Sequence, residues 1–331
     1  MGRLFFNIPF QDSCRIFLIN LCIFPLTMLI PPFLRPNAKI YIVSTAGVID
    51  AQLVENAAKI LESWGYRALV APHALEQCGR FAGTLEERLA DLQAGLDNPA
   101  YEAILFTRGG YGTIHLLDKL DLSAFLKRPK WLIGFSDITM IHSFLNTQKV
   151  CSIHGGMAKM LSESMHADIP AAKVLHNLLL GQWDSVEAKS HPLNRLGQCK
   201  GTLVGGNLSI LYSLSGTPYD IKTKEKILFI EDIGEQPYVV DRMMHNLKLS
   251  GKLDGLAGLI VGQFTDYEED ERFGKTVLEI VQDSVKDFHF PVAFDFPIGH
   301  ITNNIPLICG AEVQLTLTKE HTLLTYLKST K

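Results

Sequence analysis

Short apolar runs alternate with amphipathic segments along most of this chain. In its first half, the apolar runs are rich in β-branched and aromatic residues and predict strands, whereas the segments between them have apolar residues at helical spacing. The predicted strands are residues 39–43, 66–70, 103–106 and 131–133, and the predicted helices are residues 51–63, 85–96 and 114–120. Strands that alternate with helices form βαβ units. The pattern therefore predicts an α/β fold whose first domain, residues 37–180, has a mainly parallel sheet.

The periodicity fades between residues 181 and 200, where glycine, proline and polar residues predict a linker. A second unit follows over residues 201–331. Its predicted strands are residues 202–204, 226–230, 256–261 and 291–294, its predicted helices are residues 208–214, 238–249 and 273–288, and residues 313–317 and 323–327 predict a closing hairpin. The length of 331 residues is sufficient for two domains. We therefore expect a second α/β domain at the C-terminal end.

Residues 1–36 depart from this pattern and are treated as an N-terminal extension. Residues 16–34 are strongly apolar, which is compatible with a signal peptide or a membrane anchor. Pro25 interrupts the run, however, and no small-residue cleavage site follows it. A third interpretation is that the true start is Met28 and that the upstream residues are a mis-called start. We expect a cytoplasmic protein whose core begins near Lys39, with export or membrane anchoring through the apolar segment as alternatives.

The composition excludes several classes of protein. Hydrophobic residues make up 47% of the chain and charged residues 20%, which is ordinary for a globular protein with a sizeable core. The net charge of −4 and the absence of a basic block argue against a nucleic-acid partner. The six cysteines include no C-x-x-C pair, so neither zinc nor an iron–sulfur cluster is expected. We expect no metal and no organic cofactor.

A serine lies between a predicted strand and the helical segment that follows it. Ser136 comes two residues after Gly134, which ends the apolar run, and Asp137 begins the amphipathic segment. Hydrolases place a nucleophile at such a junction, because the hydroxyl projects into solvent and the next backbone N–H points at an anion. Serine is also a common helix N-cap. The position alone leaves both interpretations open.

Two further strand ends carry residues that would complete a catalytic site. Glu231 directly follows the strand at residues 226–230, and His300 lies in the loop after residues 291–294. A serine nucleophile needs a base, and a histidine serves best when a carboxylate fixes its tautomer. Ser136, His300 and Glu231 supply these three roles. The alternatives are a loop histidine that binds the backbone and a glutamate that pairs with Arg242 or a lysine.

The glycine-rich segment after the strand at residues 103–106 predicts an anion-binding loop. The backbone N–H groups of Gly110 and Asp137 are candidates for an oxyanion hole. Arg108 and Gly109 are candidates for binding the substrate. The Arg108 guanidinium could bind a substrate carboxylate, or alternatively it forms a structural ion pair. The segment lacks the G-x-G-x-x-G spacing and a Walker lysine, so nucleotide binding is not supported.

Taken together, these motifs resemble the LD-carboxypeptidase family of serine peptidases, which includes muramoyltetrapeptide carboxypeptidases and the microcin C immunity proteins. The resemblance runs from about Met28 to near the C-terminus. It rests on residues 42–47, 81–83 with Arg88, 108–112, 134–139, 205–208, 228–232 with Tyr238 and residues 241–242, and 296–300. The resemblance implies a Rossmann-like N-terminal domain and a smaller α/β C-terminal domain, with the catalytic triad divided between them.

The resemblance also implies an activity. It places the nucleophile on Ser136, the glutamate on Glu231, with Glu235 as the rival, and the histidine on His300. The expected reaction releases the terminal D-alanine of a murein tetrapeptide during peptidoglycan recycling in the cytoplasm, and we expect a homodimer. The alternatives are an immunity amidase that acts on a peptidyl-nucleotide antibiotic and a non-catalytic protein that binds cell-wall peptides. The sequence leaves open the diamino acid at the third peptide position.

Overall fold

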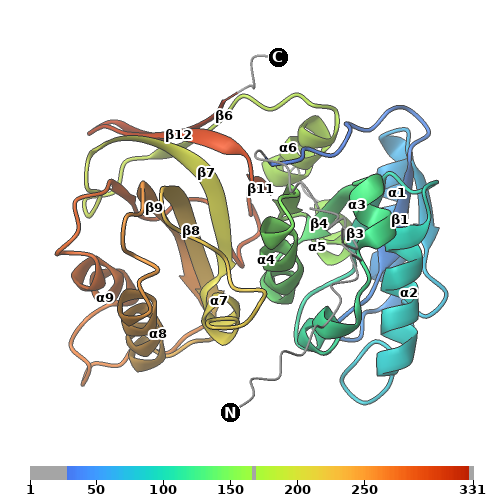
Figure 1. Cartoon of the computed structure of the whole chain (residues 1–331), viewed down its shortest axis with the longest axis horizontal. Coiled ribbons are helices and arrows are strands. Elements are labelled where there is room, and N and C mark those ends of the chain that lie inside the picture. Colours follow the sequence, from blue (N-terminus) through green and yellow to red (C-terminus); the bar gives the residue numbers. More distant parts are fainter. Residues whose placement is uncertain (1–27, 166–168, 328–331) are drawn as a thin grey trace, which may run out of the picture.

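Two sheets form the framework of the chain and lie on opposite sides of the molecule (Figure 1). The computed structural model describes residues 28–165 and 169–327. Five strands of the first sheet are parallel, and their order across the sheet is β2 (Arg67–Val70), β1 (Lys39–Val43), β3 (Ala103–Phe106), β4 (Trp131–Gly134) and β5 (Ser152–His154). The α/β fold with a parallel N-terminal sheet is therefore confirmed.

Helices cover both faces of this first sheet (Figure 1). Successive side chains of a strand point to opposite faces. Accordingly, Ile40 and Ile42 of β1 belong to one hydrophobic cluster, and Tyr41 and Val43 belong to another. The first cluster includes helices α1 (Ala51–Ser63), α5 (Ala158–Ser164) and α6 (Pro170–Leu179), and the second includes α2 (Leu85–Asp97), α3 (Ser123–Lys127) and α4 (Thr139–Thr147). Because both faces are covered, the central strands β1, β3 and β4 are almost entirely buried and apolar, whereas the edge strand β2 is largely exposed.

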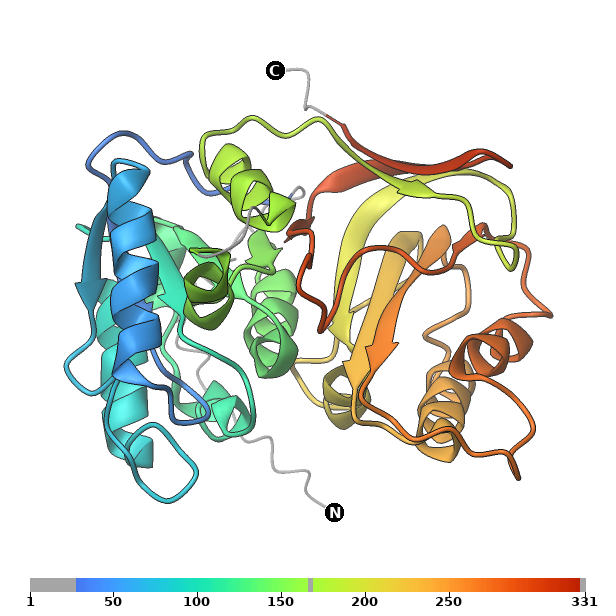
Figure 2. The same cartoon turned by 180° about the vertical axis from the view of Figure 1, so that it is seen from behind.

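The second sheet combines parallel and antiparallel strands (Figure 2). Its order is β10 (Val292–Ala293), β9 (Gly258–Thr265), β8 (Lys226–Ile233), β7 (Gly197–Asn207), β12 (Glu312–Leu317), β13 (His321–Tyr326) and β6 (Ser185–Lys189). The strands from β10 to β7 are parallel, and the remaining pairs are antiparallel. Helices α7 (Leu208–Ser213), α8 (Pro237–Leu249) and α9 (Val277–Ser284) contribute to the hydrophobic cluster on one face.

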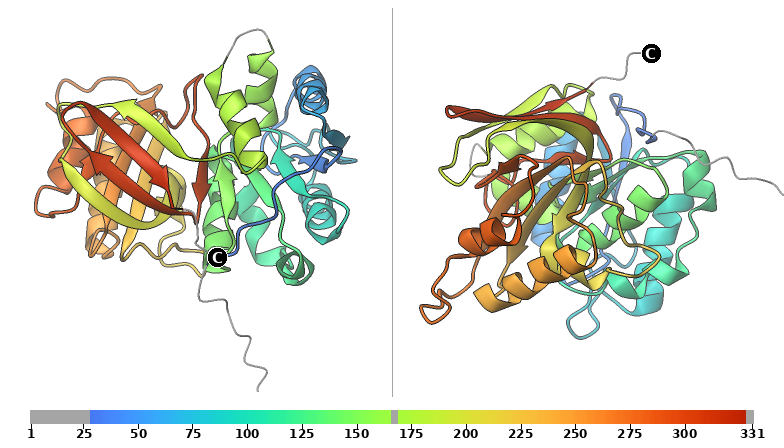
Figure 3. Two further views of the ribbon diagram at one scale, coloured as in Figure 1. Left: turned by 90° about the horizontal axis from the view of Figure 1, so that it is seen from above. Right: turned by 60° about the vertical axis from the view of Figure 1, so that its left-hand side comes forward.

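Two segments of the chain lie in a different part of the fold from the one that the expected domain boundaries assign to them. The segment expected to be a linker, residues 181–200, contains β6 and the beginning of β7, because β6 pairs with β13 at the edge of the second sheet. Strand β11 (Leu307–Cys309), from the expected C-terminal domain, pairs antiparallel with β5 of the first sheet. Figure 3 shows β11 beside that sheet, in red next to green. The segment that follows His300 therefore connects the C-terminal half of the chain to the first sheet.

One predicted helix has a different form. Residues 114–120 form two short 3₁₀ turns, at Thr113–His115 and Leu117–Lys119. The Leu116 N–H donates to the Thr113 carbonyl, three residues earlier. The Thr113 N–H itself donates to the Asp137 carboxylate, and both Leu116 and Leu117 are buried. These tertiary contacts favour the tighter turns over a regular helix.

The core does not begin at Lys39, as the sequence led us to expect, because residues 28–36 contact the first domain. Leu34 is buried, and its N–H donates to the Leu179 carbonyl. The Trp131 indole N–H donates to the Pro32 carbonyl at 3.0 Å, and the Phe33 ring stacks on Trp131. Residues 1–27, on which the signal, anchor and mis-called start interpretations depend, lie outside the described residues. Within residues 28–165 and 169–327, no helix is long and apolar enough to cross a membrane.

Candidate active site

Ser136 occupies a strained turn between β4 and α4. Its φ is 62°, a left-handed conformation that side-chain-bearing residues adopt at a cost of about 1–3 kcal/mol and that is often found at functional sites. The turn is a short 3₁₀ segment, Ser136–Ile138, and no side chain caps it. The Ser136 hydroxyl is therefore not used as an N-cap. A strained strand-to-helix turn that presents a free hydroxyl has the geometry of a nucleophile elbow.

The glycine-rich loop after β3 contacts this turn closely. A Cβ atom added to Gly109 would lie 2.8 Å from Ser136 Cβ and 2.9 Å from its Oγ, so only glycine fits at this position. The Gly109 carbonyl accepts from the Gly47 N–H at 3.4 Å. Because the C=O and N–H of a trans peptide point in opposite directions, the Gly110 N–H points away from Gly47. This orientation leaves the Gly110 N–H available to an anion.

His300 and Glu231 are joined by a hydrogen bond of 2.8 Å between Nδ1 and Oε2. The Glu231 side chain is 0% exposed at the C-terminal part of β8, and the His300 side chain is 14% exposed. Gly299 makes room for the pair, since a Cβ there would lie 3.0 Å from Glu231 Cβ. The Phe135 ring lies 4.8 Å from the imidazole ring, centroid to centroid. This contact and the hydrogen bond fix the orientation of the imidazole.

Neither alternative partner takes part in this pair. Among the described residues, no hydrogen bond or ion pair joins Glu235 to His300 or Arg242 to Glu231. The Arg242 guanidinium lies instead over the Tyr238 ring, 5.7 Å from its centroid. The imidazole binds a carboxylate rather than the backbone, so its Nδ1 donates and its Nε2 remains basic.

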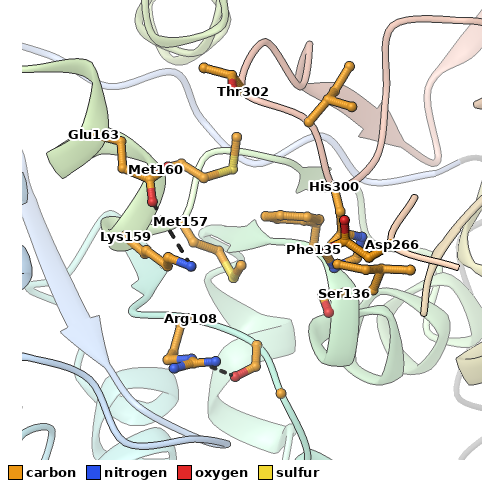
Figure 4. Close-up of a pocket in the computed structure, with 14 residues that line it drawn as sticks. Arg108, Phe135, Ser136, Met157, Lys159, Met160, Glu163, Asp266, His300 and Thr302 are labelled. Atoms are coloured by element: carbon orange, nitrogen blue, oxygen red, sulfur yellow. Dashed lines mark hydrogen bonds and ion pairs between the residues drawn. The ribbon is translucent and has the colours of Figure 1, made fainter. Parts of the chain in front are cut away.

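Ser136 and His300 line the same cavity, whose volume is about 480 Å³ (Figure 4). The described residues contain no hydrogen bond between the two side chains; catalytic hydrogen bonds in unliganded enzymes are often formed only in the complex. Four charged side chains line the cavity: Arg108, Lys159, Glu163 and Asp266. Of these four, only Arg108 was expected at the site from the sequence. Asp266 directly follows β9, which extends to Thr265 rather than ending near residue 261 as expected, and Lys159 and Glu163 lie on α5 like ordinary surface residues.

Arg108 is not part of a structural ion pair among the described residues. Its Nε donates to the Gly109 carbonyl at 3.3 Å and its Nη1 to the Val48 carbonyl at 3.2 Å. Both acceptors are uncharged backbone oxygens. The guanidinium is thereby oriented without being neutralised, and it remains available to a carboxylate.

The Asp137 side chain, and not only its backbone N–H, takes part in the site. Its Oδ2 accepts from the Thr113 N–H at 2.9 Å, and this bond connects the nucleophile turn to the glycine-rich loop. Burial raises the pKa of the Asp137 carboxyl, although the Thr113 bond and the Arg88 charge act in the opposite direction. Arg88 itself binds the carbonyls of Thr45 and Gly112. The two segments that carry the oxyanion candidates are thus held together by buried polar contacts.

A second polar connection joins the nucleophile helix to the C-terminal sheet. The Asn207 N–H donates to Thr139 Oγ1 at 3.1 Å, and the Asn207 amide donates to Asp232 Oδ1 at 2.8 Å. Burial, followed by the charge of neighbouring Glu231, raises the pKa of Asp232 to about 7. These bonds fix the position of β8, which carries Glu231, relative to the helix that follows Ser136.

Known proteins resemble the chain over most of its length. Family models for the LD-carboxypeptidase N-terminal and C-terminal domains match residues 40–155 and 200–315. A probable murein peptide carboxypeptidase of Bacillus subtilis is 33% identical over 292 residues, which cover 86% of this chain and 91% of that protein. The chain belongs to the LD-carboxypeptidase family. The sequence-based assignment to this family of enzymes is therefore confirmed.

Solved structures of the family have the same fold. The muramoyltetrapeptide carboxypeptidase from Oxalobacter formigenes superimposes with a TM-score of 0.80 at 27% identity, covering 88% of this chain and 99% of that one. An MccF-like protein from Bacillus anthracis superimposes with a TM-score of 0.78 at 22% identity, covering 91% and 99%. The second likeness concerns the fold alone. The assignment of individual residues to catalysis stays a prediction.

Proposed function

We propose that this LD-carboxypeptidase releases the terminal D-alanine of a murein tetrapeptide through an acyl-enzyme on Ser136. The observation that carries the proposal is the strained, uncapped serine on the same cavity as a histidine that is hydrogen-bonded to a buried glutamate. A free hydroxyl, a basic nitrogen and an orienting carboxylate are the groups that acyl transfer requires.

In the first half of the reaction, Ser136 Oγ attacks the carbonyl carbon of the scissile amide while His300 Nε2 takes the hydroxyl proton. The N–H groups of Gly110 and Asp137 stabilise the resulting oxyanion, and removal of one such donor typically costs about 3 kcal/mol. The tetrahedral intermediate then collapses. The C–N bond breaks, and His300 transfers its proton to the leaving amine of D-alanine.

In the second half, water replaces the amine in the same site. His300 removes a proton from the water, the hydroxide attacks the acyl carbon, and the ester bond to Ser136 breaks as the proton returns to Oγ. Glu231 remains ionised throughout and stabilises the imidazolium. Each half therefore uses the same base, orienting carboxylate and oxyanion donors.

The choice of substrate rests on the relatives. The Bacillus subtilis and Oxalobacter formigenes proteins carry the names murein peptide carboxypeptidase and muramoyltetrapeptide carboxypeptidase. A cavity with four charged side chains suits a substrate with several charged groups. The immunity amidase is supported only by a likeness of fold, and no feature of the site favours it.

The test is to incubate the purified protein with an L,D-configured murein tetrapeptide and to measure free D-alanine by mass spectrometry. We expect Ser136→Ala to fold normally and to lose at least about 10⁴-fold in kcat, since the covalent route is lost. A fluorophosphonate probe should label Ser136 in the wild type. The matched control is Ser63→Ala, on the exposed side of α1. A Ser136→Ala variant with more than a tenth of wild-type kcat would contradict the mechanism.

We further propose that the enzyme acts in peptidoglycan recycling in the cytoplasm and that it is a homodimer. Cell fractionation with intact-mass measurement tests the first proposal, and a mature chain recovered outside the cytoplasm would contradict it. Sedimentation equilibrium of the full chain tests the second. A monomeric mass at micromolar concentration would exclude a stable dimer.

A further inference from the structure

A second cavity, of about 310 Å³, adjoins the catalytic one. The two cavities share Arg108 and Gly110, so the second begins at a candidate oxyanion donor. Its lining includes Gly47, Val48, Arg80, Arg108, Gly110 and Tyr111. Two of these residues are arginines and none is a carboxylate. By contrast, the catalytic cavity balances Arg108 and Lys159 with Glu163 and Asp266.

Both arginines have capacity to bind an anion. Two of the five N–H donors of Arg108 go to the Gly109 and Val48 carbonyls, which leaves three donors on an oriented guanidinium. The Arg80 guanidinium lies 5.6 Å from the centroid of the Tyr111 ring, a cation–π contact that holds it beside the cavity. Among the described residues, neither arginine forms an ion pair with a carboxylate.

The chemistry of the proposed reaction identifies the anion. In a peptide with a free C-terminus, a single carbon atom separates the scissile nitrogen from the terminal carboxylate. A scissile carbonyl oxygen bound at Gly110 therefore brings that carboxylate close to the boundary between the two cavities, where Arg108 lies. A guanidinium binds a carboxylate through paired, charge-assisted hydrogen bonds.

We propose that the second cavity is the subsite for the terminal carboxylate of the leaving residue, and that Arg80 and Arg108 together recognise it. This inference rests on the proposed function. The subsite makes the enzyme selective for the last residue of a peptide, because an internal peptide bond has no carboxylate at this distance. Arg80 is then a specificity-determining residue that lies outside the catalytic triad.

The experiment compares two tetrapeptides that differ only at the C-terminus, one with a free carboxylate and one with a carboxamide. We expect wild-type enzyme to prefer the free acid by at least about tenfold in kcat/KM, the scale of a charge-assisted hydrogen bond. Arg80→Gln should lower kcat/KM for the free acid by about tenfold and leave the carboxamide rate unchanged. Arg80→Lys should restore part of the preference. The matched control, Arg67→Gln, removes an exposed arginine of β2 that lines neither cavity, and it should retain the preference.

The free energy of binding gives a second measure that does not depend on turnover. Ser136→Ala binds intact tetrapeptide without cleaving it, and calorimetry should show that adding Arg80→Gln weakens binding of the free acid but not of the carboxamide. If Arg80→Gln weakens both peptides equally, or neither, the subsite is wrong even though wild-type enzyme cleaves the free acid. If wild-type enzyme cleaves neither peptide and Ser136→Ala binds neither, the proposed function fails, and the proposed subsite fails with it.

Discussion

Replacing Gly109 with alanine perturbs the nucleophile without changing any catalytic group. The new methyl carbon would lie 2.8 Å from Ser136 Cβ, 2.9 Å from Ser136 Oγ and 3.3 Å from the Asp137 backbone nitrogen. Non-bonded carbon atoms are normally about 3.5–4.0 Å apart. The loop after β3 and the turn after β4 must therefore separate by about 1 Å. Both candidate oxyanion donors and the nucleophile lie on these two segments.

The expected effect on catalysis follows from this displacement. A misplacement of about 1 Å in reacting groups costs roughly a hundredfold in rate. We therefore expect kcat of Gly109→Ala to fall about a hundredfold, with a smaller change in KM, because most of the walls of the cavity remain in place. Overpacking of this kind also destabilises a protein, typically by about 1–3 kcal/mol.

Two measurements on the same samples separate these effects. Release of D-alanine from the tetrapeptide gives kcat, and urea unfolding gives the free energy of unfolding. The control is Gly216→Ala, where φ is +80° and an added Cβ would meet no atom within 4 Å. Backbone strain there should cost stability, on the order of 1 kcal/mol, without loss of kcat. A Gly109→Ala variant with wild-type kcat, or equal losses in both variants, would refute the reasoning.

Three other predictions concern the carboxylates and the N-terminal segment. Glu231→Gln should lower kcat by several orders of magnitude with little change in KM, because an amide cannot stabilise the imidazolium. Glu235→Gln should have only a small effect on kcat. Steady-state kinetics would show the opposite order of effects if the assignment is wrong. Burial raises the pKa of Asp232 from 3.8 to about 7. Between these pH values the folded protein keeps a proton that the unfolded chain has lost. The free energy of unfolding therefore falls as the pH rises through this window. Urea unfolding should therefore show that Asp232→Asn gains stability relative to wild type between pH 4 and pH 8, by on the order of a few kcal/mol; a constant difference would contradict this. A chain that begins at Lys39 should be less stable than one that begins at Met28 by at least about 3 kcal/mol. It loses the burial of Leu34 and the hydrogen-bond acceptor of the Trp131 indole. Equal urea midpoints would show that residues 28–38 contribute nothing to stability.

The sequence by itself determined the elements whose signal is local. The apolar runs at residues 39–43, 103–106 and 131–133 are strands in the structure, because each ends at a glycine or polar residue and each is almost entirely buried. The position of Ser136 just after a strand could likewise be identified, since the end of an apolar run is visible in the sequence. Glu231, by contrast, lies within β8, which continues to Ile233 beyond the expected strand end at residue 230. The combined motifs were specific enough to indicate the family, which the comparisons confirm.

Only the tertiary structure decided which distant segments meet. Strand β11 pairs with β5, about 150 residues earlier, and no local periodicity encodes the partner of a three-residue strand. The contacts of Asp137 with Thr113 and of Gly109 with Ser136 likewise join segments that are separate in sequence. The cavity beside Arg80 exists because loops after different strands converge at the same edge of the sheet. Residue type and spacing indicate which secondary structure a segment favours by itself. The chemistry depends on the distances between segments, and these are set by the packing of the two sheets and their helices.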